Sequence, residues 1–111
     1  MSSNEELLYI LHSAMQAQDK KTAENYWQKL YQNNVKSIQN ISYAFKEIYA
    51  KSNEDNETID REANKAFLQA CQSYDPNFDL NFDLWMTTVI KKNLKNVIHQ
   101  KGLVNQYDHI S

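Results

Sequence analysis

Hydrophobic residues recur every three or four positions along most of this chain, the spacing that gathers side chains on one face of an α-helix. The first such stretch opens with Ser3 and Glu6, which have the spacing of a capping box. The pattern therefore predicts a first helix over residues 3–18. Its apolar side is formed by Leu7, Leu8, Ile10, Leu11, Ala14 and Met15.

A second and much longer periodic stretch begins at Thr22 and continues to Tyr49. It predicts one long or broken helix that faces the core throughout. The run KSNEDNET that follows contains no apolar residue, so we expect a loop over residues 51–57. The apolar positions of the long helix are Tyr26, Trp27, Leu30, Tyr31, Val35, Ile38, Ile41, Phe45, Ile48 and Tyr49.

The last part of the chain predicts two helices on either side of a proline. Apolar spacing indicates a third helix over residues 58–73. Pro76 has no N–H and disfavours helix in the residue before it, so the segment DPNFDLNF must be a connector. A fourth helix is expected to begin at residue 81 or 82 and to run to about residue 101, with Gly102 at its C-cap.

Composition supports an all-α fold. The 111 residues include one Gly and one Pro, too few for the turns of most β-sheets. The length suits a single hydrophobic core. We expect one domain over residues 1–111, a compact bundle of about four to five helices.

The residue types that enzymes use form no clear constellation here. The single cysteine, Cys71, lies in a predicted helix beside Ala70, where a small buried side chain is the simpler interpretation. The three histidines lack metal-ligand spacing, and one glycine cannot make a Gly-rich phosphate loop. We therefore expect no enzymatic activity, no metal and no cofactor.

Targeting signals are also missing from the sequence. No apolar run approaches the roughly 18 residues that a membrane-spanning helix needs. The N-terminal residues lack the basic, apolar and small-residue zones of a signal peptide. We therefore expect a cytoplasmic protein without a membrane partner.

Charge is unevenly divided along a chain whose formal net charge is -2. Residues 1–83 hold 8 Lys or Arg against 13 Asp or Glu, whereas residues 84–111 hold 4 against 1. Such segregation favours a binding face for a polyanion. A merely solvated helix face is the alternative interpretation.

The predicted fourth helix separates its charges from its apolar residues. Upstream of the charges, the rings of Tyr74, Phe82 and Trp85 bracket the connector and the first helical turn, a placement that suits stacking on single-stranded bases. Ordinary core packing is the alternative for each ring. The apolar side of the helix is Val89, Ile90, Leu94, Val97 and Ile98, and the polar side is Lys91, Lys92, Lys95 and His99.

The stretch TIDREANKAFLQACQSYDPNFDLNFDLW resembles the second conserved region of bacterial RNA polymerase sigma factors, where a helix of the type DLIQEG..GL..A...FDP..G..F..Y occurs. VIKKNLKNVI is similar to the family's WIRQAI stretch, and AENYWQKLYQNNVKSI to its LEELYERYRPLVYSIA. The resemblance covers about residues 19–104. The matching positions are Ile59, Glu62, Phe67, Leu68, Ala70, Tyr74, Asp75, Pro76, Phe82 and Trp85.

This resemblance implies a promoter-recognition domain that binds core RNA polymerase and helps to open the -10 element. The third helix would dock on the clamp coiled coil of the polymerase's largest subunit, and the fourth would hold the -10 non-template strand, with a flipped base among the aromatic rings. The implied polymerase contacts are Thr58, Arg61, Glu62, Asn64 and Leu68. The implied DNA contacts are Tyr74, Phe82, Trp85, Thr88, Lys91, Lys92, Lys95, Asn96, His99 and Lys101.

Some positions depart from the family pattern. The paired aromatic residues that hold melted DNA are Thr88 and Val89 here, which makes the resemblance one to an alternative sigma factor. An anti-sigma factor and a separate subunit that reads the -35 element are further partners that the resemblance leaves open. Two other functions also stay open: a helical module that binds polymerase without DNA, and a phage or plasmid regulator that binds duplex DNA.

Overall fold

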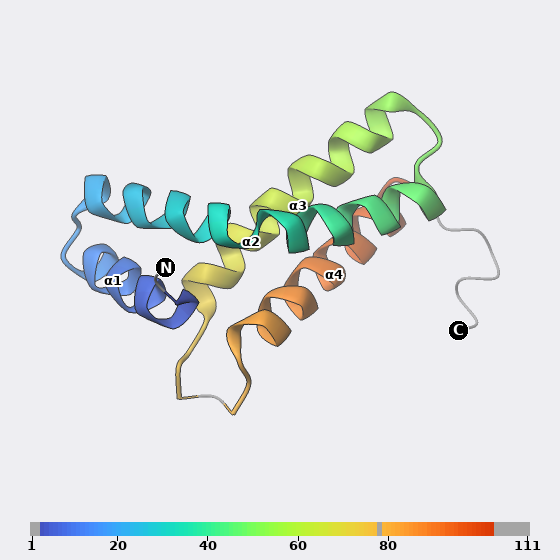
Figure 1. The fold of residues 1–111 in the computed structure, drawn as a ribbon. Coiled ribbons are helices and arrows are strands. Elements are labelled where there is room, and N and C mark those ends of the chain that lie inside the picture. The colour runs from blue at the N-terminus through green and yellow to red at the C-terminus, as the bar shows by residue number, and fades with distance from the viewer. Residues whose placement is uncertain (1–2, 78, 104–111) are drawn as a thin grey trace.

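The computed structural model describes residues 3–77 and 79–103, and in these residues it has four helices and no strand (Figure 1). The all-α prediction is confirmed. Helix α2 packs against each of the other three helices, so it is the element around which the bundle forms. The helices are α1 (Asn4–Gln16), α2 (Lys20–Tyr49), α3 (Asn53–Ser73) and α4 (Phe82–Gln100).

Helix α1 folds back along the first half of α2, and α3 crosses α2 near its middle (Figure 1). The return of α1 is fixed by paired side-chain amides, because Asn4 and the buried Asn34 exchange hydrogen bonds of 3.3 and 3.0 Å. Helix α4 then lies beside α3 and also contacts α2. None of the helices in the described ranges is both long and apolar enough to cross a membrane.

Side chains cap the starts of α1 and α2, and the cap of α1 is the one that the sequence predicted. The Ser3 hydroxyl accepts a hydrogen bond of 3.2 Å from the Glu6 N–H at the start of α1. At the start of α2, the Asp19 carboxylate accepts from the Thr22 N–H at 3.2 Å and from its hydroxyl at 2.7 Å. Between the two helices Gln18 adopts a left-handed φ of 58°, which ends α1 and turns the chain.

The prediction of a loop over residues 51–57 is wrong for residues 53–57, because α3 already begins at Asn53. The Ser52 hydroxyl caps this helix by accepting from the Asp55 N–H at 3.1 Å. Glu54 and Asp55 stand in the first turn, where negative charge interacts favourably with the helix dipole. Capping and charge thus extend the helix into a segment that has no apolar periodicity.

Helix α4 begins and ends close to the predicted residues. The Asn81 side chain accepts from the Leu84 N–H at 2.9 Å and caps its start. At its end Gly102 has a φ of 69°, and the Leu103 N–H donates to the Ile98 carbonyl at 2.9 Å, a Schellman arrangement. The predicted C-cap role of Gly102 is therefore confirmed.

The core side of α4 is a single row of apolar residues spaced four apart. Their relative exposures are at most 1%, and they contact the buried side chains of the neighbouring helices. Because every fourth residue of a helix lies on nearly the same side, this row leaves the opposite side free. The row consists of Phe82, Met86, Ile90, Leu94 and Ile98.

Two adjacent substitutions test this division of α4. Ile90→Ala is expected to lower the free energy of unfolding by ~2–5 kcal/mol, because it removes a fully buried side chain and leaves a cavity. Lys91→Ala, one residue further on the exposed side, should change it by less than about 0.5 kcal/mol. Urea denaturation followed by circular dichroism measures both. Equal losses in the two variants would contradict the orientation of α4.

Candidate nucleic-acid interface

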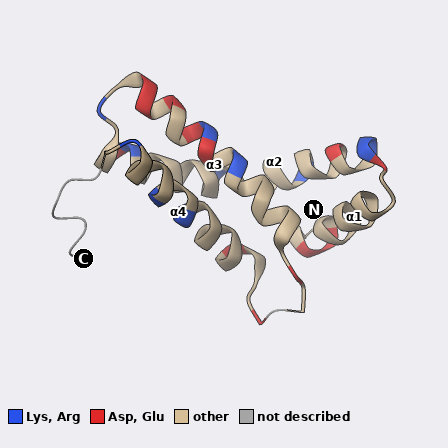
Figure 2. Ribbon diagram, turned by 180° about the vertical axis from the view of Figure 1, so that it is seen from behind, with Lys and Arg blue, Asp and Glu red and all other residues tan. Residues whose placement is uncertain are grey.

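The solvent side of α4 carries the predicted basic face. Figure 2 marks the lysines of α4 in blue. Lys91, Lys92 and Lys95 are exposed, on the side away from the buried row. No acidic residue occurs between Leu84 and the end of this helix. The exposed side chains of the face are Leu84, Thr88, Lys91, Lys92, Lys95, Asn96 and His99.

Three lysines of this face keep their charge available. Lys91, Lys92 and Lys95 have no carboxylate partner within ion-pair distance in the part of the chain that the structure describes. Charges of this kind, held on a rigid helix, attract phosphate groups. The ion pairs in the described ranges instead use Lys46, Lys65 and Lys101.

The fourth lysine predicted to contact DNA has a different role. Lys101 Nζ lies 3.5 Å from a carboxylate oxygen of Asp55 and 3.4 Å from the hydroxyl of Thr58. It ties the end of α4 to the first turns of α3. Thr58, predicted to contact polymerase, is only 8% exposed beneath this contact. The burial of Thr58 is against the predicted polymerase contact, and Lys101, although exposed, helps to hold two helices together.

The pKa of the Asp55 carboxyl is lowered at this junction. The main cause is the hydrogen bond of 2.8 Å that it accepts from the Lys51 N–H, and the charge of Lys101 acts in the same direction. Burial acts in the opposite direction but is outweighed. Asp55 therefore stays ionised, and it holds the loop before α3 as well as the end of α4.

Two of the three predicted stacking rings belong to the core. Tyr74 is 7% exposed and Phe82 is 1% exposed, and their rings meet edge to face with centroids 5.4 Å apart. The Tyr74 hydroxyl donates to the Leu80 carbonyl at 3.0 Å, which closes the connector. Neither ring offers a free face, so the predicted base pocket of three rings does not form in this arrangement.

Trp85 is half-buried, and it is the one predicted ring that reaches the surface. Its indole N–H donates to the Ala70 carbonyl at 3.2 Å, which anchors the ring against the end of α3. Its neighbour Leu84 is 55% exposed on the basic face, a feature that the sequence reasoning did not single out. Asp83 also lies in this first turn, so the start of α4 is not purely basic.

The remaining predicted polymerase contacts lie along α3. Arg61, Asn64 and Leu68 are spaced three and four apart, are exposed or half-buried, and form one outer stripe. Glu62 stands beside this stripe and pairs with Lys65 at 3.7 Å. The structure thus keeps four of the five predicted contacts accessible.

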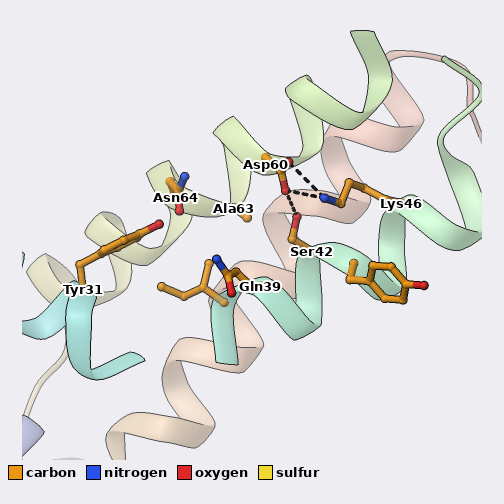
Figure 3. Close-up of a pocket in the computed structure, with 9 residues that line it drawn as sticks. Tyr31, Gln39, Ser42, Lys46, Asp60, Ala63 and Asn64 are labelled. Atoms are coloured by element: carbon orange, nitrogen blue, oxygen red, sulfur yellow. Dashed lines mark hydrogen bonds and ion pairs between the residues drawn. The ribbon is translucent and has the colours of Figure 1, made fainter. Parts of the chain in front are cut away.

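A polar hollow between α2 and α3, next to this stripe, was not predicted (Figure 3). It contains Asp60, which accepts a hydrogen bond from Ser42 and pairs with Lys46 at 3.0 Å. These partners lie 18 and 14 residues from Asp60 in the sequence, so no local motif could have indicated them. Asn64 belongs to both the stripe and the hollow.

Cys71 is fully buried, and burial raises the pKa of its thiol to about 12. The sulfur is therefore protonated near neutral pH and does not act as a thiolate. Among residues 3–77 and 79–103, no group of three or more His, Cys, Asp or Glu side chains is arranged to hold a metal ion.

No protein-family model, no curated protein and no solved structure matches this chain in the three comparisons. The functional assignment therefore depends on the residues and on the geometry described above.

The Asp55 junction, in which Asp55 pairs with Lys101 and accepts from the Lys51 N–H, makes the stability of the fold depend on pH. Because the pKa of Asp55 is lower in the folded chain than in the unfolded one, ionised Asp55 stabilises the fold above the ordinary aspartate pKa of 3.8. This stabilisation is lost as the pH falls through the folded value. Asp55→Asn should thus lower the melting temperature near pH 7, and its difference from the parent should shrink below about pH 4. The exposed Glu54→Gln is the control for thermal scans between these pH values.

We expect truncation of the Trp85 side chain to lower the stability of the fold. Trp85→Ala removes half-buried ring packing and the hydrogen bond to Ala70, so we expect the free energy of unfolding to fall by ~2–4 kcal/mol. Trp85→Phe keeps most of the packing and should cost only ~0.5–1.5 kcal/mol. Chemical denaturation of the two variants measures the difference. A Trp85→Ala protein as stable as the parent would show that the ring does not anchor α4.

Proposed function

We propose that this chain is a cytoplasmic promoter-recognition domain of sigma type. In this proposal α4 binds the -10 non-template strand, and α3 docks on the clamp coiled coil of core RNA polymerase. The observation that carries it is the exposed face of α4, where Lys91, Lys92 and Lys95 have no carboxylate partner among residues 3–77 and 79–103. Because the buried row stands opposite, phosphates can bind this face without disturbing the core.

The chemistry of the α4 face suits a phosphate backbone. Each lysine that neutralises a phosphate releases a condensed counterion, which supplies most of the sequence-independent affinity. Thr88, Asn96 and His99 lie on the same exposed side. The Asn96 amide can hydrogen-bond to the strand, and the Thr88 hydroxyl, which donates to the Leu84 carbonyl at 2.8 Å, can still accept. Phosphate contacts would therefore position the strand along the helix axis, and these polar groups would add base contacts.

Because Tyr74 and Phe82 are buried, base stacking contributes less to strand binding in this proposal than charge does. Stacking would be limited to the accessible part of the Trp85 ring, so charge provides most of the strand affinity. Polymerase docking is supported by the accessible stripe of Arg61, Asn64 and Leu68, which stands on α3 and leaves the lysines of α4 free.

A helical protein-interaction module that binds polymerase without DNA is the second candidate. It is favoured by the two buried rings and by Asp83, which places a negative charge in the first turn of α4. Capture of purified core polymerase by the chain, with no strand binding in the presence or absence of core, would select this candidate.

Salt dependence tests the proposed strand binding. Three lysine contacts to a single strand predict a slope of log affinity against log salt of about -2.1, taking roughly -0.7 for each phosphate. Alanine at Lys91, Lys92 or Lys95 should reduce the magnitude of the slope by about 0.7 each. Lys101→Ala should lower stability but leave the slope unchanged, because Asp55 already holds this lysine. Fluorescence anisotropy with a labelled -10 strand measures the slope.

Matched controls make this measurement specific. Lys36 is exposed on α2, away from the face, so Lys36→Ala should leave strand affinity unchanged. Equal affinity for any duplex DNA would instead favour a duplex-binding regulator. A slope near zero would remove α4 from the interface.

A further inference from the structure

The hollow between α2 and α3 has the features of a built binding site. Its volume is about 420 Å³, within the roughly 300–1,000 Å³ of ligand clefts. Figure 3 shows a charged group at one end and the Tyr31 ring at the other, with Gln39 and Asn64 nearby. The floor includes the apolar side chains of Ile38 and Ala63.

The charged group is centred on Asp60. Its carboxylate accepts a hydrogen bond of 2.5 Å from the Ser42 hydroxyl, and Lys46 Nζ lies 3.0 and 3.1 Å from its two oxygens. Ser42 is 2% exposed, so its buried hydroxyl orients the carboxylate. The Asp60 side chain is nevertheless 50% exposed. A carboxylate has about four acceptor positions, so this one can accept further N–H groups from a ligand.

Among the other polar groups of the hollow, the Tyr43 hydroxyl already donates to Glu47 at 2.6 Å, but three are without a partner in the described ranges. The amides of Gln39 and Asn64 and the hydroxyl of Tyr31 have no hydrogen-bond partner among the residues that the structure describes. Each of these groups has an oxygen that can accept a hydrogen bond. The Tyr31 ring is itself held in place, because Trp27 stacks on it with centroids 5.7 Å apart. The hollow thus combines a carboxylate, three neutral oxygens and a fixed aromatic ring.

This combination matches a guanidinium group. A guanidinium is planar, carries five N–H donors, binds carboxylates in a bidentate manner and stacks on aromatic rings. An anion is disfavoured, because Lys46 is the one basic residue of the lining and Asp60 already neutralises it. We infer that the hollow binds the guanidinium group of arginine, in competition with Lys46 for Asp60.

The hollow overlaps the residues of the proposed function at Asn64 alone. It is formed by α2 and α3, whereas strand binding is assigned to α4. Asn64 is shared with the stripe proposed to dock on polymerase, but arginine binding by the hollow does not require that partner. Failure of strand binding would therefore leave this inference intact, and the reverse also holds.

The test uses N-acetyl-arginine-amide as the probe and the full chain as the receptor. Its titration, followed by amide resonances in nuclear magnetic resonance, should give saturable shifts at Ser42, Gln39 and Asn64. The lysine and citrulline analogues should bind at least about tenfold more weakly, because neither combines charge with a planar fork. Asp60→Asn should also weaken arginine binding at least about tenfold, while its amide oxygen still accepts from Ser42.

The variant Lys46→Met gives the sharpest result. It removes the internal competitor, so arginine should bind several-fold more tightly, whereas the exposed control Lys36→Met should leave its affinity unchanged. Weaker arginine binding in Lys46→Met would show that Lys46 does not compete for Asp60 and would overturn the inference. The absence of saturable shifts in the parent, or equal affinities for the arginine, lysine and citrulline probes, would overturn it as well. Thermal unfolding of each variant verifies that it is folded.

Discussion

The packing of one row of α4 against α2 and α3 is the constraint on which the remaining structure depends. Every fourth residue from Phe82 to Ile98 is at most 1% exposed. Such a row winds by about 40° at each step, so it follows an inclined line on the helix and meets its neighbours at an angle. Because the fully buried residues of α4 lie on that line, the opposite side is exposed to solvent. The core therefore determines which side of α4 is accessible, and the lysines on that side make it basic.

The ends of the helices are held by local hydrogen bonds and by one long-range junction. Ser3, Asp19, Ser52 and Asn81 cap the four starts. The Asp55 junction then joins the end of α4 to the start of α3, which keeps the buried row in register with its partners. Lys101, which the sequence predicted to bind phosphate, thus helps to position the basic face of α4.

Local patterns predicted the helices because periodicity and caps are properties of neighbouring residues. The start of α3 was missed although its signal was present, since Ser52 and Asp55 have the spacing of a capping box. The exposure of Lys91, Lys92 and Lys95 could also be predicted, because it depends on the turn of one helix. The contacts of Tyr74 and Lys101 could not be predicted, because they depend on which residues another segment brings against them. The α2–α3 hollow depends on three-dimensional contacts in the same way.

The position of charge along α4 determines where a polyanion can approach. Asp83 precedes Lys91 by eight residues, or about 12 Å at 1.5 Å per residue. This exceeds the screening length of about 8 Å at physiological ionic strength, so Asp83 weakens the attraction of Lys91 for phosphate only slightly. Trp85 is two residues from Asp83, and residues two apart point to nearly opposite sides of a helix, so the Asp83 carboxylate does not share the side of the ring. The lysines of the face begin at Lys91, so the attraction for a polyanion is strongest along the second half of α4.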